Sequence, residues 1–86
     1  MNNDDRMKAI QERLTTALSP QQLEVINESQ HHVGHAGAST GMGHFALTIQ
    51  SPLFEGKNLV QQHRLIYEAL GSLMETDIHA LRITIL

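Results

Sequence analysis

The chain has 86 residues, including six histidines and no cysteine, and its formal net charge is −3 with histidine neutral. This length suits one small domain, so we expect a single domain over residues 1–86. The lack of cysteine excludes disulfide-stapled miniproteins, zinc fingers and thiol catalysis by this chain alone. No apolar run approaches the roughly 20 residues that span a bilayer. The first residues are too acidic and polar for a signal peptide, so we expect a cytoplasmic protein with no membrane contact.

The first predicted element is a helix that ends at Ser19-Pro20, because proline disfavours helical angles in the residue before it. Asn3 or Asp4 is its expected cap, and residues 1–5 are expected to be flexible. Apolar residues recur at three- and four-residue steps along it, which predicts one buried stripe made of Met7, Ile10, Leu14, Ala17 and Leu18.

Two strands are predicted next, over residues 23–29 and 44–50, where apolar and polar side chains alternate. Residues 30–43 between them hold four of the six glycines and almost no large apolar side chain. A core cannot contain such a segment, so we predict that residues 30–43 form an exposed, mobile loop between two antiparallel strands.

A second helical stripe begins after Asn58, its expected cap, and a division of this helix near Gln61 stays open. The predicted stripe contains Leu59, Gln62, Ile66, Leu70 and Leu73, widened by Val60, Leu65 and Ala69. Residues 80–86 alternate again and predict a last strand. A strand–helix–strand crossover sets the last two strands parallel. We therefore predict an α+β fold of order α-β-β-α-(α)-β, in which helices cover one face of a three-stranded mixed sheet.

No recognisable catalytic motif is present. The chain lacks G-x-S-x-G and a glycine-rich phosphate loop, and its carboxylates form no pair typical of a hydrolase. We therefore expect a protein that is not an enzyme.

The histidines are better candidates. His32 and His35 form H-x-x-H in the predicted loop, and neutral imidazole suits zinc, copper, iron or nickel. A solvated polar loop is the simpler interpretation of this spacing. His79 precedes the last strand, where strand parity would put its ring on the face of Leu81; it is either a ligand at the rim of the sheet or a histidine bonded to the backbone there.

Several motifs occur in order along the chain: Leu23-Glu24-Val25, Asn27-Glu28-Ser29, a histidine loop, His44-Phe45, Phe54-Glu55-Gly56-Lys57, Leu59-Val60, His63-Arg64-Leu65-Ile66-Tyr67 and Ile78-His79-Ala80-Leu81. In this combination, from about Leu14 to the C-terminus, the chain resembles the BolA family. The resemblance implies a fold like the type II KH domain.

The resemblance also implies a partnership with a monothiol glutaredoxin through a bridged 2Fe–2S cluster, for cluster trafficking, assembly or iron regulation. In that family the histidine of the His-Ala-Leu motif, here His79, is the principal ligand, and a loop residue after Asn-Glu-Ser is the second. That position corresponds to His32, with His35 as an alternative. The glutaredoxin cysteine and glutathione would supply the thiolates. We expect a monomer alone and a heterodimer with this partner.

The alternative implied by the family is a DNA-binding transcriptional regulator with a KH-like fold. Its candidate contacts are Lys57, His63 and Arg64, which form a small basic patch. The sequence lacks the G-x-x-G loop of KH domains, and we identify no aromatic platform for stacking bases.

Overall fold

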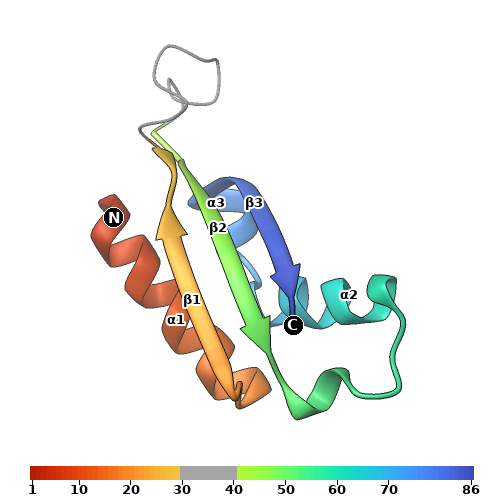
Figure 1. Ribbon diagram of the computed structural model, residues 1–86. Helices are drawn as coiled ribbons and strands as arrows, with labels where there is room; N and C mark the ends of the chain where they lie inside the picture. The colour runs from red at the N-terminus through yellow and green to blue at the C-terminus, as the bar shows by residue number, and fades with distance from the viewer. Residues whose placement is uncertain (30–40) are drawn as a thin grey trace.

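The computed structural model describes residues 1–29 and 41–86, so His31, His32 and His35 lie outside the described residues. Figure 1 shows the predicted α+β order, with the second helix divided in two. The elements are α1 (Asn3–Leu18), β1 (Gln22–Asn27), β2 (Gly43–Gln50), the 3-10 turn η3 (Pro52–Phe54), α2 (Leu59–Leu70), α3 (Leu73–Thr76) and β3 (Ile78–Ile85). Within the described parts of the chain, no helix is long and apolar enough to cross a membrane.

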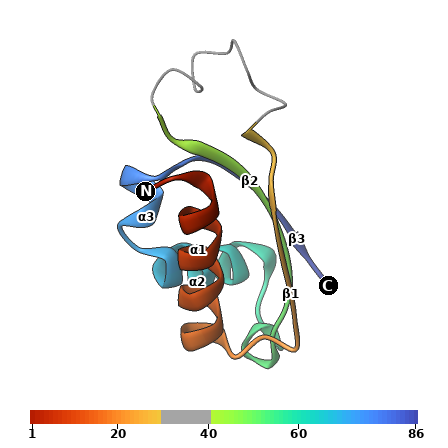
Figure 2. The same cartoon turned by 90° about the vertical axis from the view of Figure 1, so that its left-hand side faces the viewer.

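The three strands form one mixed sheet in the order β1-β2-β3. β1 pairs antiparallel with β2, and β2 pairs parallel with β3, as the crossover predicted. Figure 2 shows the helices gathered on one face of this sheet, while no helix of residues 1–29 and 41–86 lies over the opposite face. The predicted topology is therefore confirmed.

The core lies between the covered face of the sheet and the helices. Alternate β2 side chains, those of Phe45, Leu47 and Ile49, are at most 1% exposed, as strand parity requires. They belong to one cluster with buried side chains of the helices, namely Ile10, Leu14, Leu18, Ile66, Leu70 and Leu73. The large apolar side chains of the core thus lie on the covered face. Polar side chains lie on the open face and at the ends of the strands.

The first helix starts earlier than predicted. Its N-cap is Asn2, whose side chain accepts a hydrogen bond from the backbone N–H of Asp5 at 2.8 Å, so Asn3 and Asp4 lie inside the helix rather than capping it. Asn2 and the residues that follow it thus form the cap and first turn of this helix. The helix ends before Ser19, as proposed from the Ser-Pro pair.

The second helical region divides at Gly71 and Ser72, not near Gln61. Gln61 instead completes a capping box with Asn58, the predicted cap, which strengthens the start of α2. Gly71 has a φ of +55°, which a glycine tolerates, and the helix ends there. The predicted apolar stripe is wrong at its first residues, because Leu59 and Val60 are 61% and 65% exposed.

The strand ends also differ from the predicted ranges. β1 ends at Asn27, before the predicted limit, and β3 begins at Ile78 rather than at Ala80. Gly43 was assigned to the mobile loop, but it opens β2 and is buried. Its backbone N–H donates to the carbonyl of Asp77 at 2.9 Å, and this bond extends the β2–β3 pairing by one residue. Sheet structure thus reaches close to the predicted histidine loop.

Candidate functional site

The end of β1 and the beginnings of β2 and β3 meet at one end of the sheet, which we call the histidine edge and define by Ser29, His44 and His79. The antiparallel β1 arrives there, and the parallel β2 and β3 both start there (Figure 1). The N-terminus of α1 also lies near this end (Figure 2). Segments that are distant in sequence therefore converge where two histidines begin neighbouring strands.

The imidazole rings of His44 and His79 contact each other at this edge. Their centroids are 4.9 Å apart, and the ring planes are inclined by 48°. His79 is exposed, whereas His44 is only 7% exposed. The edge therefore presents one accessible imidazole supported by one buried imidazole.

A β-bulge explains the position of His79. The register pairs Gly43 with Ile78 and then His44 with Ala80, so His79 is an extra residue in β3. The parity prediction for His79 does not hold, because strict alternation stops at this bulge: His79 and Ala80 are both exposed between buried Ile78 and half-buried Leu81. The side chain of His79 is therefore exposed at the bulge.

Sequence reasoning did not single out His44 as a site residue. The available signal was topological, because parallel strands over residues 44–50 and 80–86 place their first residues side by side. The bulge that completes the approach leaves no signature in a single sequence.

The open face next to His44 contains a hollow of about 250 Å³, lined by Glu28, His44, Phe45, Ala80, Leu81 and Arg82. Arg82 Nη2 lies 2.6 Å from Glu28 Oε2, so an ion pair joins β3 to the end of β1 across the central strand. The hydrogen bond from Arg82 to Glu28 raises the pKa of the guanidinium further above its ordinary value. The hollow is thus bordered by a charged pair on one side and imidazole on the other.

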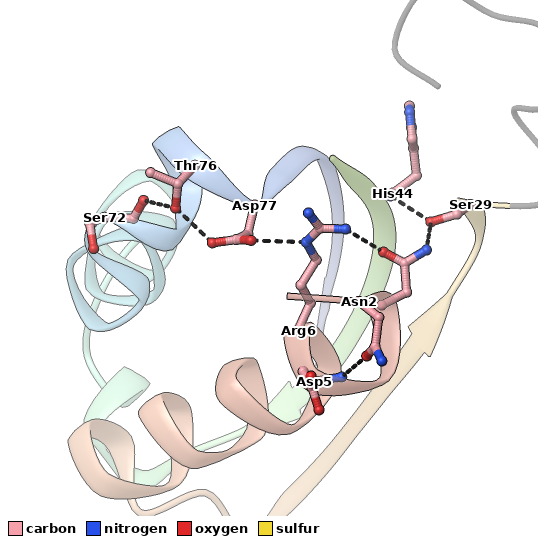
Figure 3. Close-up of polar contacts among 9 residues, drawn as sticks. Asn2, Asp5, Arg6, Ser29, His44, Ser72, Thr76 and Asp77 are labelled. Atoms are coloured by element: carbon pink, nitrogen blue, oxygen red, sulfur yellow. Dashed lines mark hydrogen bonds and ion pairs between the residues drawn. The ribbon is translucent and has the colours of Figure 1, made fainter. Parts of the chain in front are cut away.

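A chain of hydrogen bonds on the other side connects α1 with the histidine edge (Figure 3). Arg6 Nε donates to Asp77 Oδ1, and Arg6 Nη1 donates to Asn3 Oδ1, both at 2.9 Å. Asn3 Nδ2 donates to Ser29 Oγ at 3.2 Å, and the same oxygen accepts from the backbone N–H of His44 at 3.1 Å. These hydrogen bonds therefore connect Asp77, the residue before β3, with the backbone of β2.

Asp77 is held as a carboxylate within this chain. The hydrogen bond from Thr76 Oγ1 and then the one from Arg6 lower the pKa of Asp77 below its ordinary 3.8, against the opposing effect of burial. Thr76 Oγ1 lies 2.7 Å from Asp77 Oδ2, so both carboxylate oxygens accept a hydrogen bond.

The three basic candidates lie elsewhere, at α2. Lys57 precedes the helix and donates from Nζ to the carbonyl of Leu53 at 2.9 Å. His63 and Arg64 line a hollow of about 300 Å³ with Val60 and Tyr67. Tyr67 is 43% exposed and meets the His63 ring edge-on at a centroid distance of 6.3 Å. An exposed aromatic ring therefore accompanies the basic patch, which the sequence analysis had not identified.

The described residues offer an incomplete set of metal ligands. Across residues 1–29 and 41–86, no group of three or more His, Cys, Asp or Glu side chains is placed to hold a metal ion. His79 and His44 bring two imidazole rings together at one point, and the His44 ring is buried.

The chain is similar to known proteins over most of its length. The mouse (Mus musculus) BolA-like protein 1 is 44% identical over 75 residues, which cover 87% of this chain and 53% of the relative. The Escherichia coli (strain K12) protein named DNA-binding transcriptional regulator BolA is 38% identical over 72 residues, covering 84% of this chain and 66% of the relative. The chain spans about half the length, or less, of several curated relatives.

The solved BolA domain of SufE1 from Arabidopsis thaliana matches with a TM-score of 0.81 and 42% identity, over 93% of this chain and 88% of that one. The family model described as BolA-like protein matches residues 14–86, which include β1, β2, β3 and both histidines of the edge. The chain belongs to the BolA-like family.

Proposed function

We propose that the chain is a non-enzymatic partner of a monothiol glutaredoxin, with which it holds a bridged 2Fe–2S cluster through His79. The pair would serve cluster trafficking or assembly, or iron regulation. The observation that carries the proposal is the exposed imidazole of His79, set on a bulge beside the buried ring of His44. In this proposal the chain is a monomer alone and a heterodimer with its partner.

The donor set fits a shared cluster better than one held by this chain alone. The chain has no cysteine, and its described residues contain no complete metal site. Imidazole can replace thiolate on one iron, as in Rieske centres, which raises the reduction potential of the cluster. His79 would present the nitrogen and His44 would support its ring, while the glutaredoxin cysteine and glutathione would contribute sulfur.

The second histidine ligand would come from the segment after Ser29. His32 follows Ser29 by three residues and His35 by six. Segments of these lengths span at most about 11 and about 22 Å, so the covalent chain allows either histidine to reach the histidine edge. We propose His32, with His35 as the alternative.

Anaerobic reconstitution of the chain with a monothiol glutaredoxin and glutathione tests the proposal. The wild-type mixture is expected to show visible absorption and circular-dichroism bands that differ from those of glutaredoxin alone. His79→Ala should return the spectrum to the glutaredoxin form. The matched control is His63→Ala on α2, which should leave the wild-type spectrum intact.

The single variants His32→Ala and His35→Ala identify the second ligand, because only one of them should change the spectrum. A wild-type mixture indistinguishable from glutaredoxin alone contradicts the proposal. So does a His79→Ala mixture that keeps the wild-type bands.

A second candidate function is binding of duplex DNA. The Escherichia coli relative is named a DNA-binding transcriptional regulator, and α2 of this chain exposes Arg64 beside His63 and Tyr67. Lys57 at the start of the helix adds a further cation. The net charge of −3 opposes this function, so the affinity would depend on this patch alone.

Salt-dependent binding to a DNA duplex tests this second candidate. Arg64→Ala should weaken binding and reduce the slope of log affinity against log salt by about 1, the share of one phosphate contact. Lys8→Ala, which removes one exposed charge from α1, is the control and should change neither. Equal effects of the two substitutions would exclude a DNA site on α2.

A further inference from the structure

We propose that Arg6 is a positioning residue, which sets the distance between β2 and β3 at the histidine edge and so holds the rings of His44 and His79 together. The role of these rings as part of a ligand site rests on the proposed function, whereas the positioning itself is a property of the chain alone. Arg6 acts on this edge through its hydrogen-bond partners Asp77 and Asn3.

The Arg6 side chain uses two of its nitrogens in two directions. Nε donates to Asp77, whose backbone carbonyl accepts the N–H of Gly43 and which stands just before β3. Nη1 donates to Asn3. One guanidinium therefore ties the start of α1 to the junction between α3 and β3.

Asn3 extends this connection to the other two strands. Its amide donates to Ser29 Oγ, just after β1 ends, and Ser29 Oγ accepts the backbone N–H of His44 in β2. Asn3 also packs closely against Gly43, because a Cβ built on Gly43 would lie 2.8 Å from Asn3 Oδ1. A continuous set of hydrogen bonds thus connects α1 with β2, with Ser29 just after β1 and with Asp77 just before β3, at the edge that carries both histidines (Figure 3).

Burial and geometry make arginine the suitable residue at this position. The side chains of Arg6 and Asp77 are each 12% exposed, so solvent screens their ion pair weakly. The planar guanidinium holds two acceptors at fixed directions, whereas a lysine ammonium on a flexible stem does so poorly. Arg6 and Asn3 both lie outside the part of the chain that the family model matches, which begins at residue 14.

The test uses the full chain without cluster or partner and follows it by NMR at one fixed pH. The first readout is the cross-relaxation between the ring protons of His44 and His79. The second is amide hydrogen exchange of Gly43 and His44, compared with that of Ile66 in the core, which reports global opening. The variants are Arg6→Ala, Arg6→Lys and Asn3→Ala.

The control is Arg13→Ala. Arg13 lies on the same helix and donates from Nη1 to the carbonyl of Leu70, the last residue of α2, at 3.1 Å. We expect Arg6→Ala to abolish the ring–ring signal and to raise exchange at Gly43 and His44 at least tenfold more than at Ile66. Arg6→Lys should restore part of the signal, and Arg13→Ala should change only global stability.

Asn3→Ala keeps the proposal testable if Arg6→Ala does not fold, because it leaves the buried ion pair with Asp77 intact. It should selectively raise exchange at His44, which loses the support of Ser29. If Arg6→Ala or Asn3→Ala changes all amides alike and keeps the ring–ring signal, the positioning role is refuted. Loss of the cluster spectrum in the wild-type heterocomplex would refute the proposed function only, since these measurements need no cluster.

Discussion

The backbone N–H of Gly43 donates to the carbonyl of Asp77 at 2.9 Å, which joins the first residue of β2 to the residue before β3. Gly43 can make this approach because it has no side chain. A Cβ at this position would lie 2.5 Å from Cε2 of Phe45, inside any normal contact distance. The close junction of the two strands therefore depends on this glycine.

Gly43→Ala is expected to lower the free energy of unfolding by about 2–3 kcal/mol, because the added methyl group forces the buried Phe45 ring or Asn3 to move. Urea unfolding followed by far-ultraviolet circular dichroism measures the change. The control is Gly71→Ala, which puts a side chain at a positive φ of +55° between α2 and α3 and costs about 1–3 kcal/mol.

Only the first of these two variants should also perturb the NMR signals of His44 and His79. Wild-type stability in Gly43→Ala would show that the Phe45 ring has room to move and that the junction is not tightly packed.

Two ion pairs of the same type differ in environment, which predicts different effects. Arg6 and Asp77 are each 12% exposed, whereas Arg82 is 68% exposed in its pair with Glu28. Arg6→Ala leaves a shielded carboxylate without its cation and should lower the free energy of unfolding by about 3 kcal/mol. Arg82→Ala removes a pair on the open face and should change stability little. Chemical denaturation of both variants, side by side, makes the comparison, and equal losses would contradict it.

Asp77 predicts a particular pH dependence of stability. Its folded-state pKa lies below the ordinary 3.8, first because of the hydrogen bond from Thr76 and then because of Arg6. The unfolded chain therefore binds the proton more tightly, so the stabilisation is complete well above pH 4 and is lost as the pH falls through the folded-state pKa. Asp77→Asn should have lower stability than wild type at pH 7 and should lose less on acidification.

Thermal unfolding at a series of pH values between 7 and 2.5 measures this dependence. Glu12→Gln, which removes an exposed carboxylate from the middle of α1, is the control and should keep the wild-type acid dependence. An unchanged acid slope in Asp77→Asn would mean that other carboxylates carry the effect.

The local patterns were sufficient to predict the elements and their topology. The alternation in residues 44–50 and the stripe around Ile10 and Leu14 each predict which face of their element is buried. The structure buries these faces. The end of the first helix at Ser19 was predictable for the same reason, since the effect of proline on its neighbour is local.

The parts that sequence reasoning missed depend on contacts between distant residues. The bulge at His79 arises from the pairing of β2 with β3, so the partnership of His79 with His44 could not be read from spacing. The helix cap fell on Asn2 while Asn3 turned toward Ser29, a bond across the fold. Leu59 shows the same limit, because spacing alone placed it in the predicted stripe, whereas its side chain is 61% exposed.

The two adjacent imidazoles of the edge can be separated by substitution. His79 is exposed, whereas His44 is 7% exposed, so in the proposed complex a cluster carried by the partner would reach His79 first. His44→Phe keeps a planar ring against His79 but removes both nitrogens. We expect the reconstituted heterocomplex of His44→Phe to retain the wild-type visible and circular-dichroism bands, and that of His79→Phe to lose them. Loss of the bands in His44→Phe, with the variant folded by far-ultraviolet circular dichroism, would instead assign the ligand role to His44.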